Sequence, residues 1–227
     1  MKRDIDINDI SDGRLYSLND MVRADCNDCP GCSSCCRGMG ESIILDPRDI
    51  FQMSLGTGKS PKELLETYLE LQVVEGIILP HLRQEGEAEA CLFLDAQGRC
   101  RIHAFRPGIC RLFPLGRIYE NQEVKYFLQI HECPKPSKGK VKVKKWLDVP
   151  ETKQYEQFIL EWHYFLLDLQ DEMERRADDS FQKEVNMLLL QLFFLCPYEM
   201  ERDFYRQFQE RKNQVQQAIT VNYSFRV

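Results

Sequence analysis

The chain has 227 residues, of which 43% are hydrophobic and 29% charged, and its formal net charge is -6 at pH 7. This length can bury a sizeable core, so its ten cysteines are not needed as staples for a small scaffold. The negative charge argues against broad electrostatic binding to nucleic acid, and the longest apolar run, residues 187–196, is too short to span a bilayer. We expect a soluble globular protein.

Residues 1–8 are charged and lack the apolar run of a signal peptide. We therefore expect a cytoplasmic location, where thiols stay reduced. Cysteines in a reducing compartment are typical of metal ligands rather than of disulfides, which argues against a disulfide knot.

Short elements are predicted in the first 90 residues. Residues 1–25 are polar and are expected to form a strand or loop arm, and residues 42–45 a short strand. Asp46 followed by proline predicts a helix start, and Ser60 begins a second one in a capping box with a glutamate three residues later. Residues 73–79 are expected to form a strand.

Two hairpins are predicted in the next region. Residues 91–94 and 100–103 would form the first, around a turn at residues 95–98, with a cysteine at each outer end. Residues 117–119 and 124–130 would form the second.

After residue 134 the sequence contains no further cluster of cysteines and falls into two segments. Residues 135–149 begin with six lysines among Ser, Gly and Pro, which is typical of a solvated linker. Residues 150–227 show apolar positions at a helical period, which predicts three helices. The sequence therefore predicts an α+β fold with an irregular, metal-centred cysteine-rich region at residues 1–134 and a helical region after the linker.

The cysteines carry the chemical signal. Five of them fall within residues 26–36, and C-x-x-C spacing turns both sulfurs to one side of a tight loop. Four more follow at Cys91, Cys100, Cys110 and Cys133. Such a density of thiols indicates a site for a soft metal.

This pattern resembles the CxxCxxCC family of zinc- or iron-chelating proteins, also called YkgJ-like cysteine cluster proteins. The matching cysteines are Cys29, Cys32, Cys35, Cys36, Cys91, Cys100, Cys110 and Cys133. Arg106-Pro107, Arg111 and Phe113-Pro114 match as well, so that the resemblance covers roughly residues 26–134. It implies metal chelation more firmly than any reaction. One branch of the family includes flagellin lysine methylases, but no glycine-rich nucleotide loop is visible here.

The eight matching cysteines are the predicted metal ligands. Adjacent Cys35 and Cys36 point in different directions in an extended chain, which favours an iron–sulfur cluster, of 4Fe-4S type, over a single tetrahedral zinc. Zinc stays open, since thiolates suit either metal.

Other residues near the cysteines are expected to have supporting roles. Arginines that flank the cysteines can offset the thiolate charge, namely Arg37, Arg101, Arg106 and Arg111. His103 and His131 are expected to have hydrogen-bonding or surface roles, and Cys196 to be a core thiol. Cys26, which the resemblance leaves outside the family's core, could be a ligand or not.

Three functions remain open from the sequence. The first is a metal-binding protein, carrying an iron–sulfur cluster, in electron transfer or in support of a modifying enzyme. The second is a structural zinc module that binds a protein partner, and the third is a methylase-like enzyme. We expect a protein partner, and neither a nucleic acid nor a membrane. We also expect the metal to order residues 26–40 and 91–133.

Overall fold

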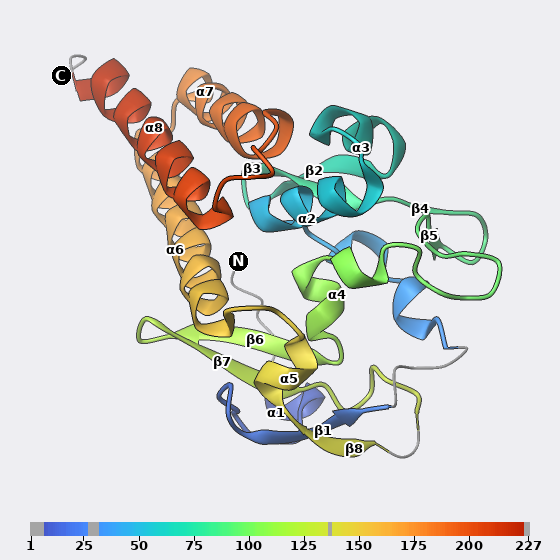
Figure 1. Ribbon diagram of the computed structural model, residues 1–227. Helices are drawn as coiled ribbons and strands as arrows, with labels where there is room; N and C mark the ends of the chain where they lie inside the picture. Colours follow the sequence, from blue (N-terminus) through green and yellow to red (C-terminus); the bar gives the residue numbers. More distant parts are fainter. Residues whose placement is uncertain (1–6, 27–31, 136–137, 225–227) are drawn as a thin grey trace.

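The computed structural model describes residues 7–26, 32–135 and 138–224. Within these ranges the strands form four separate antiparallel ribbons of two strands each, and three helices, the two longest among them, follow one another in the C-terminal third. Figure 1 shows these helices on one side and at the top of the molecule, with the ribbon of β1 (Met21–Asp25) and β8 (Gly139–Lys142) at the opposite end. Short strands combined with a helical C-terminal region confirm the predicted α+β class. No helix in the described ranges is long and apolar enough to cross a membrane.

The N-terminal arm is largely irregular. Its elements are α1 (Ile7–Ile10), β1 (Met21–Asp25) and two 3-10 turns, η1 (Ser34–Cys36) and η2 (Gly40–Ser42). The strand expected at residues 42–45 is reduced to a single bridge between Ile44 and His81. Neither 3-10 turn contains a buried residue, so this segment contributes little to the core.

Capping boxes start the next two helices, α2 (Pro47–Thr57) and α3 (Pro61–Thr67). In α2, Asp46 accepts the Asp49 amide at 2.9 Å and the Asp49 carboxylate accepts the Asp46 amide at 3.0 Å. Ser60 and Glu63 form the same reciprocal pair at α3, on the molecular surface. Both predicted helix starts are confirmed, and a left-handed Gly58 ends α2.

A hairpin follows where one strand was expected. It consists of β2 (Leu69–Val74) and β3 (Ile77–Leu82), so the strand predicted at residues 73–79 is wrong in its bounds. The turn lies at Glu75 and Gly76, both with positive φ, which the sequence pattern concealed within an apolar run. Asn186 holds this turn, because its side chain accepts the Ile78 amide at 2.7 Å and donates to the Gly76 carbonyl at 3.0 Å.

The cysteine-rich middle of the chain is mostly turns. Its elements are β4 (Gln84–Glu85), β5 (Ala90–Cys91), η3 (His103–Phe105) and α4 (Gly108–Leu112). The hairpin predicted from residues 91–94 and 100–103 is reduced to one bridge between Leu94 and Cys100. The predicted turn between them forms, since Asp95 accepts the amides of Gln97 and Arg99. The second predicted hairpin is confirmed as β6 (Leu115–Glu120) and β7 (Glu123–Leu128).

The lysine-rich segment is folded, contrary to the expectation of a solvated linker. It contains β8 (Gly139–Lys142), which pairs with β1, and α5 (Val143–Leu147). Valines alternate with the lysines, and Val141, Val143 and Leu147 are buried while the lysines face outward. Lysine content suggested a linker, but the alternating valines provide the buried face of a strand.

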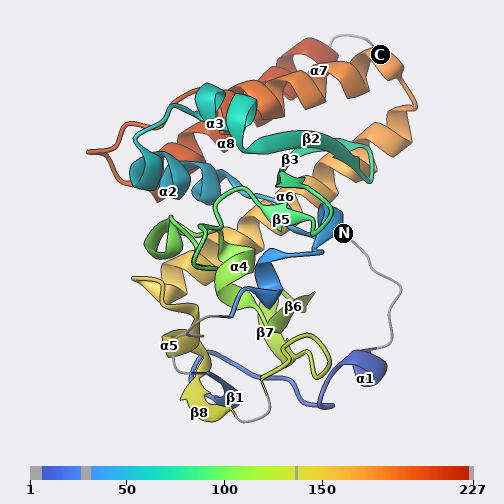
Figure 2. The ribbon, with the colours of Figure 1, turned by 90° about the vertical axis from the view of Figure 1, so that its right-hand side faces the viewer.

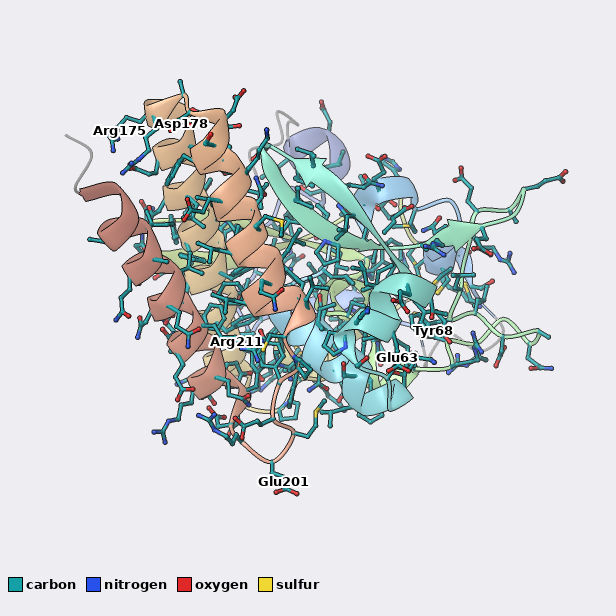
Figure 3. The ribbon with its side chains drawn as sticks, turned by 90° about the horizontal axis from the view of Figure 1, so that it is seen from above. Glu63, Tyr68, Arg175, Asp178, Glu201 and Arg211 are labelled. Carbon is teal, nitrogen blue, oxygen red and sulfur yellow. The ribbon has the colours of Figure 1, made fainter. Side chains whose placement is uncertain are left out.

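The C-terminal region forms the predicted helices, α6 (Thr152–Arg176), α7 (Asp179–Leu189) and α8 (Phe204–Ser224), with a π-helical turn, η4 (Leu190–Leu195), after α7. Phe158, Trp162, Phe193 and Phe208 pack edge-on or tilted in their interior. Arg211, labelled in Figure 3, donates to the carbonyls of Leu192, Cys196 and Pro197 and thereby satisfies the end of η4. The apolar core is one continuous cluster from the N-terminal arm to α8.

Candidate metal centre

Cysteine side chains from sequence-distant segments line one cavity of about 160 Å³. These are Cys26, Cys32, Cys35, Cys36, Cys91, Cys100, Cys110 and Cys133. Seven of the eight predicted ligands are therefore brought together, and Cys29 lies outside the described residues. Cys26 lines the cavity as well, at the end of β1. Cys196 is half-buried at the end of η4 and is not part of the cavity wall.

The rest of the wall is largely apolar. It includes Ile43, Leu82, Phe93, Ile102, Phe113 and Trp146. Ile43 follows η2 and Leu82 ends β3, whereas Phe93 and Ile102 lie in the turns between β5 and η3. Phe113 follows α4 and Trp146 lies in α5, so the cavity lies where the two cysteine regions meet the core. Such a wall lowers the local dielectric and strengthens every charge interaction inside it.

Five of the thiols influence one another's ionisation, and we call them the inner group: Cys35, Cys36, Cys91, Cys100 and Cys110. The Cys36 thiol donates a hydrogen bond to Cys35, which lowers the pKa of Cys35 to about 7, and the Arg106 charge acts in the same direction. The same hydrogen bond raises the pKa of Cys36, as do its burial and the nearby Cys110 and Cys91. Cys35 is thus poised as the first thiolate of the group.

The other inner thiols resist ionisation. Burial raises the pKa of Cys91, Cys100 and Cys110, and the neighbouring thiols add to the effect. For Cys110 the carboxylate of Asp49 is the largest contribution after burial. Thiolates gathered in this way repel one another unless a cation lies between them. Metal binding to the inner group must therefore release protons, and its affinity depends on pH.

Two of the four flanking arginines act on the thiols. Arg106 and Arg101 oppose the burial that raises the pKa of Cys100. Arg111 is buried and donates to the backbone carbonyls of Ala104, Arg106 and Asp148, so its role is to hold the turn around α4. Arg37 donates to the Ser33 hydroxyl at 3.2 Å.

Helix α2 holds the segment between Cys100 and Cys110 at two points. The Asp49 carboxylate, 3% exposed, accepts the Gly108 amide at 2.7 Å, at the start of α4. Gly56 packs against the Phe105 ring so closely that an added Cβ would lie 2.7 Å from it. Sequence reasoning recognised the Asp46 cap but missed Asp49 as a support of the site. The position of Asp49 in the capping box is visible in the sequence. Its hydrogen bond to Gly108 is not, because no sequence pattern links the two residues.

The histidines take the minor roles expected of them. His103 lines the cavity, with Nδ1 3.2 Å from the Arg106 guanidinium, and His131 is exposed. His81, in β3 next to Leu82, is buried, and its Nδ1 lies 2.6 Å from the Glu41 carbonyl oxygen.

The donor set fits a soft metal. In the described part of the chain, no group of three or more His, Cys, Asp or Glu side chains is placed so that it could hold a metal ion. The thiols instead surround a volume close to that of a cavity known to hold benzene, about 150 Å³. All-thiolate donors suit zinc, iron or an iron–sulfur cluster.

The cysteine-rich part of the chain matches one known family. Residues 26–134 match CxxCxxCC, described as "Putative zinc- or iron-chelating domain". The matched range, residues 26–134, is the one that we expected, and it begins at Cys26. No curated protein and no solved structure matches the chain.

Proposed function

Because residues 26–134 of this chain match the model of the CxxCxxCC family of zinc- or iron-chelating domains, we propose that the cysteine cavity holds an iron–sulfur cluster of 4Fe-4S type. Such a cluster takes four thiolates, and the inner group offers five: Cys35, Cys36, Cys91, Cys100 and Cys110. The observation that carries the proposal is a cavity of about 160 Å³ with these thiols on its wall. A group of several atoms fills such a volume better than one ion does.

The surroundings of the inner group suit a redox centre. Apolar residues limit the access of water, and Arg106 adds a positive charge beside Cys35 and Cys100. Burial, charge and hydrogen bonds to sulfur are the properties that set the potential of a cluster. A bound cluster supplies one-electron transfer. We propose a cytoplasmic role in electron transfer or in support of a modifying enzyme, together with a protein partner.

A structural zinc site is the second candidate. Four of the same thiols could close around one zinc at Zn–S distances of about 2.3 Å, which would contract the cavity. Support for this alternative comes from the position of the thiols between two regions of the chain, because a structural zinc ties such regions together.

Purification under anaerobic conditions separates the two candidates. The cluster is expected to give broad absorption at about 400 nm, with iron and acid-labile sulfide in equal amounts. Zinc in the purified chain, with no visible absorption and no sulfide, would contradict the cluster and leave the structural zinc site. Reconstitution of the apoprotein with iron and sulfide, and separately with zinc, shows which form is retained through gel filtration.

A further inference from the structure

The β1–β8 ribbon presents a basic outer surface. Its inner side is buried through Val22, Ala24 and Val141. Its outer side, continued by α5, carries exposed residues from two distant parts of the chain: Met21, Arg23, Lys140, Lys142, Lys144 and Lys145. We call this set the basic face. Figure 2 shows the ribbon and α5 at the end of the molecule opposite α7.

The charge of the basic face contrasts with that of the whole chain. Six lysines fall within residues 135–145, and no acidic residue occurs from Lys135 to Leu147. Without these six, the 30 basic residues of the chain become 24 against 36 acidic ones, a net charge of -12. Such asymmetry creates a local positive potential on an otherwise negative protein.

The ammonium groups of these lysines are not neutralised within the described residues. None of the six takes part in an ion pair there, while lysines elsewhere, such as Lys125 and Lys212, lie within 2.8 Å of a carboxylate. Lys140, Lys142, Lys144 and Lys145 are exposed. Their charges are therefore free to meet an external partner.

The basic face is continuous with the metal centre. Cys133 and Pro134, just before the lysines, and Trp146, in α5, line the cysteine cavity. Lys138 donates to the Cys133 carbonyl oxygen at 3.1 Å. A partner bound to the basic face would therefore lie close to the cysteine cavity, because Trp146, next to Lys145, is part of its wall.

We propose that the basic face is the docking surface for an acidic protein, the partner that the metal centre serves. This role for the partner rests on the proposed function, whereas the docking itself requires no particular metal. Complementary charge gives fast and specific association of the transient kind that electron transfer and enzyme support require.

The composition of the basic face favours a protein over other polyanions. Phosphate groups are recognised in fork geometry by arginine, and only Arg23 is present among the exposed residues of the face. Met21, 48% exposed at its edge, offers the apolar contact that protein interfaces favour.

The test uses the holoprotein and a fluorescent polyglutamate chain of 20 residues as the acidic polypeptide. We expect saturable binding that weakens as ionic strength rises. The triple charge reversal K140E/K142E/K144E should weaken it at least tenfold. The matched control is K62E/K153E/K183E, which reverses three exposed lysines elsewhere and gives the same net charge. This control should bind like the parent.

Three outcomes would overturn the proposal. One is equal loss of binding in both triple variants, which would show a net-charge effect only. Another is tighter binding of duplex DNA or of phosphatidylserine vesicles than of polyglutamate at about 0.15 M salt. The last is a rate of metal loss to the neutral chelator 1,10-phenanthroline that is the same with and without bound polyglutamate. Docking beside the cavity should slow this loss. Metal identity is measured separately, so a zinc form that still binds polyglutamate refutes the proposed function and keeps the docking surface.

Discussion

Asp49 connects the start of one helix to the start of another. One carboxylate oxygen accepts the Asp46 amide of the α2 capping box, and the other accepts the Gly108 amide at the start of α4. Gly108 has no space for a side chain, since a Cβ would collide with the Tyr155 hydroxyl. The backbone that carries Cys110 is therefore held by one carboxylate and one close contact.

The first prediction is that Asp49→Ala weakens metal binding by about 10- to 100-fold, the range typical of residues that orient metal ligands. Its physical reason is the loss of the Gly108 hydrogen bond, which lets Cys110 move. Asp49→Asn retains an acceptor oxygen for Gly108 and should restore most of the affinity. The measurement is competition with a chelator, together with the thiolate-to-metal absorption band of the cobalt-loaded protein.

Two control variants separate this role from helix capping. Asp46→Ala removes the cap of α2 but leaves the Gly108 bond, and Glu63→Gln alters the exposed capping box of α3, labelled in Figure 3. Asp46→Ala should cost stability of up to about 2 kcal/mol, and neither variant should change metal affinity. Equal weakening of metal binding by Asp46→Ala and Asp49→Ala would show that Asp49 acts only as part of the cap.

The second prediction compares two cysteines. Cys110→Ala should lower the metal bound per chain, because Cys110 belongs to the inner group that surrounds the cavity. Cys196→Ala should keep the full amount, because Cys196 lies at the end of η4 with its thiol 3.8 Å from the Pro197 carbonyl oxygen. The measurement is elemental analysis of the purified variants. Full metal in Cys110→Ala would mean that Cys110 is not a ligand and that the remaining thiols of the inner group are sufficient.

Helix α6 packs on the β6–β7 ribbon through stacked rings. The Tyr119 ring and the His163 ring lie with their centroids 3.8 Å apart and nearly parallel. Burial, with a smaller effect of Arg117, lowers the pKa of His163 to about 4. The His163 ring is therefore neutral in this stacked contact at neutral pH.

The third prediction concerns acid stability. In the unfolded chain His163 has its ordinary pKa of about 6.5, so between about pH 4 and 6.5 the unfolded state binds more protons than the folded state. Stability is therefore lost as the pH falls through this window. His163→Phe should reduce the loss, as measured from urea midpoints at several pH values. His131→Gln, an exposed site, should leave it unchanged, and the same pH profile in all three proteins would contradict the prediction.

Elements with local signals were predictable from the sequence. The caps at Asp46 and Ser60, the β6–β7 hairpin and the helical period of α6 all depend on neighbours within a few residues. The β1–β8 ribbon was missed because β8 pairs with a strand more than 110 residues away. Its lysine content also matched that of a linker.

The candidate site was predictable in its residues but not in its supports. Cysteine spacing indicated the thiols, since ligands must gather whatever the fold around them. Asp49, by contrast, reaches Gly108 across 59 residues, and the three carbonyls that Arg111 contacts are set by the turn around α4. Such contacts follow from tertiary packing, and no local pattern encodes them.

The two cysteine regions are held in the molecule by different means. Residues 100–113 are fixed by Asp49, by Arg111 and by Trp146, whose indole donates to the Leu112 and Phe113 carbonyls at 3.3 and 3.2 Å. Residues 32–42 contain no buried side chain and are attached to the hairpin after β3 by single bonds, such as that from the Gly38 amide to the Glu89 carbonyl. Metal binding must therefore contribute more to the order of residues 32–42 than to that of residues 100–113.

The last prediction is that removal of the metal exposes residues 32–42 to proteases and leaves residues 100–128 protected. This narrows the sequence-based expectation, under which residues 91–133 would also open. The apolar core from Tyr16 to Val215 does not include the 32–42 segment, so helices α6 to α8 should keep their far-UV signal. Limited proteolysis of holo and apo protein, with cleavage sites found by mass spectrometry, tests it. Cleavage within β6 or β7 in the apo form would show that the metal orders both regions, and equal resistance of residues 32–42 in both forms would show that it orders neither.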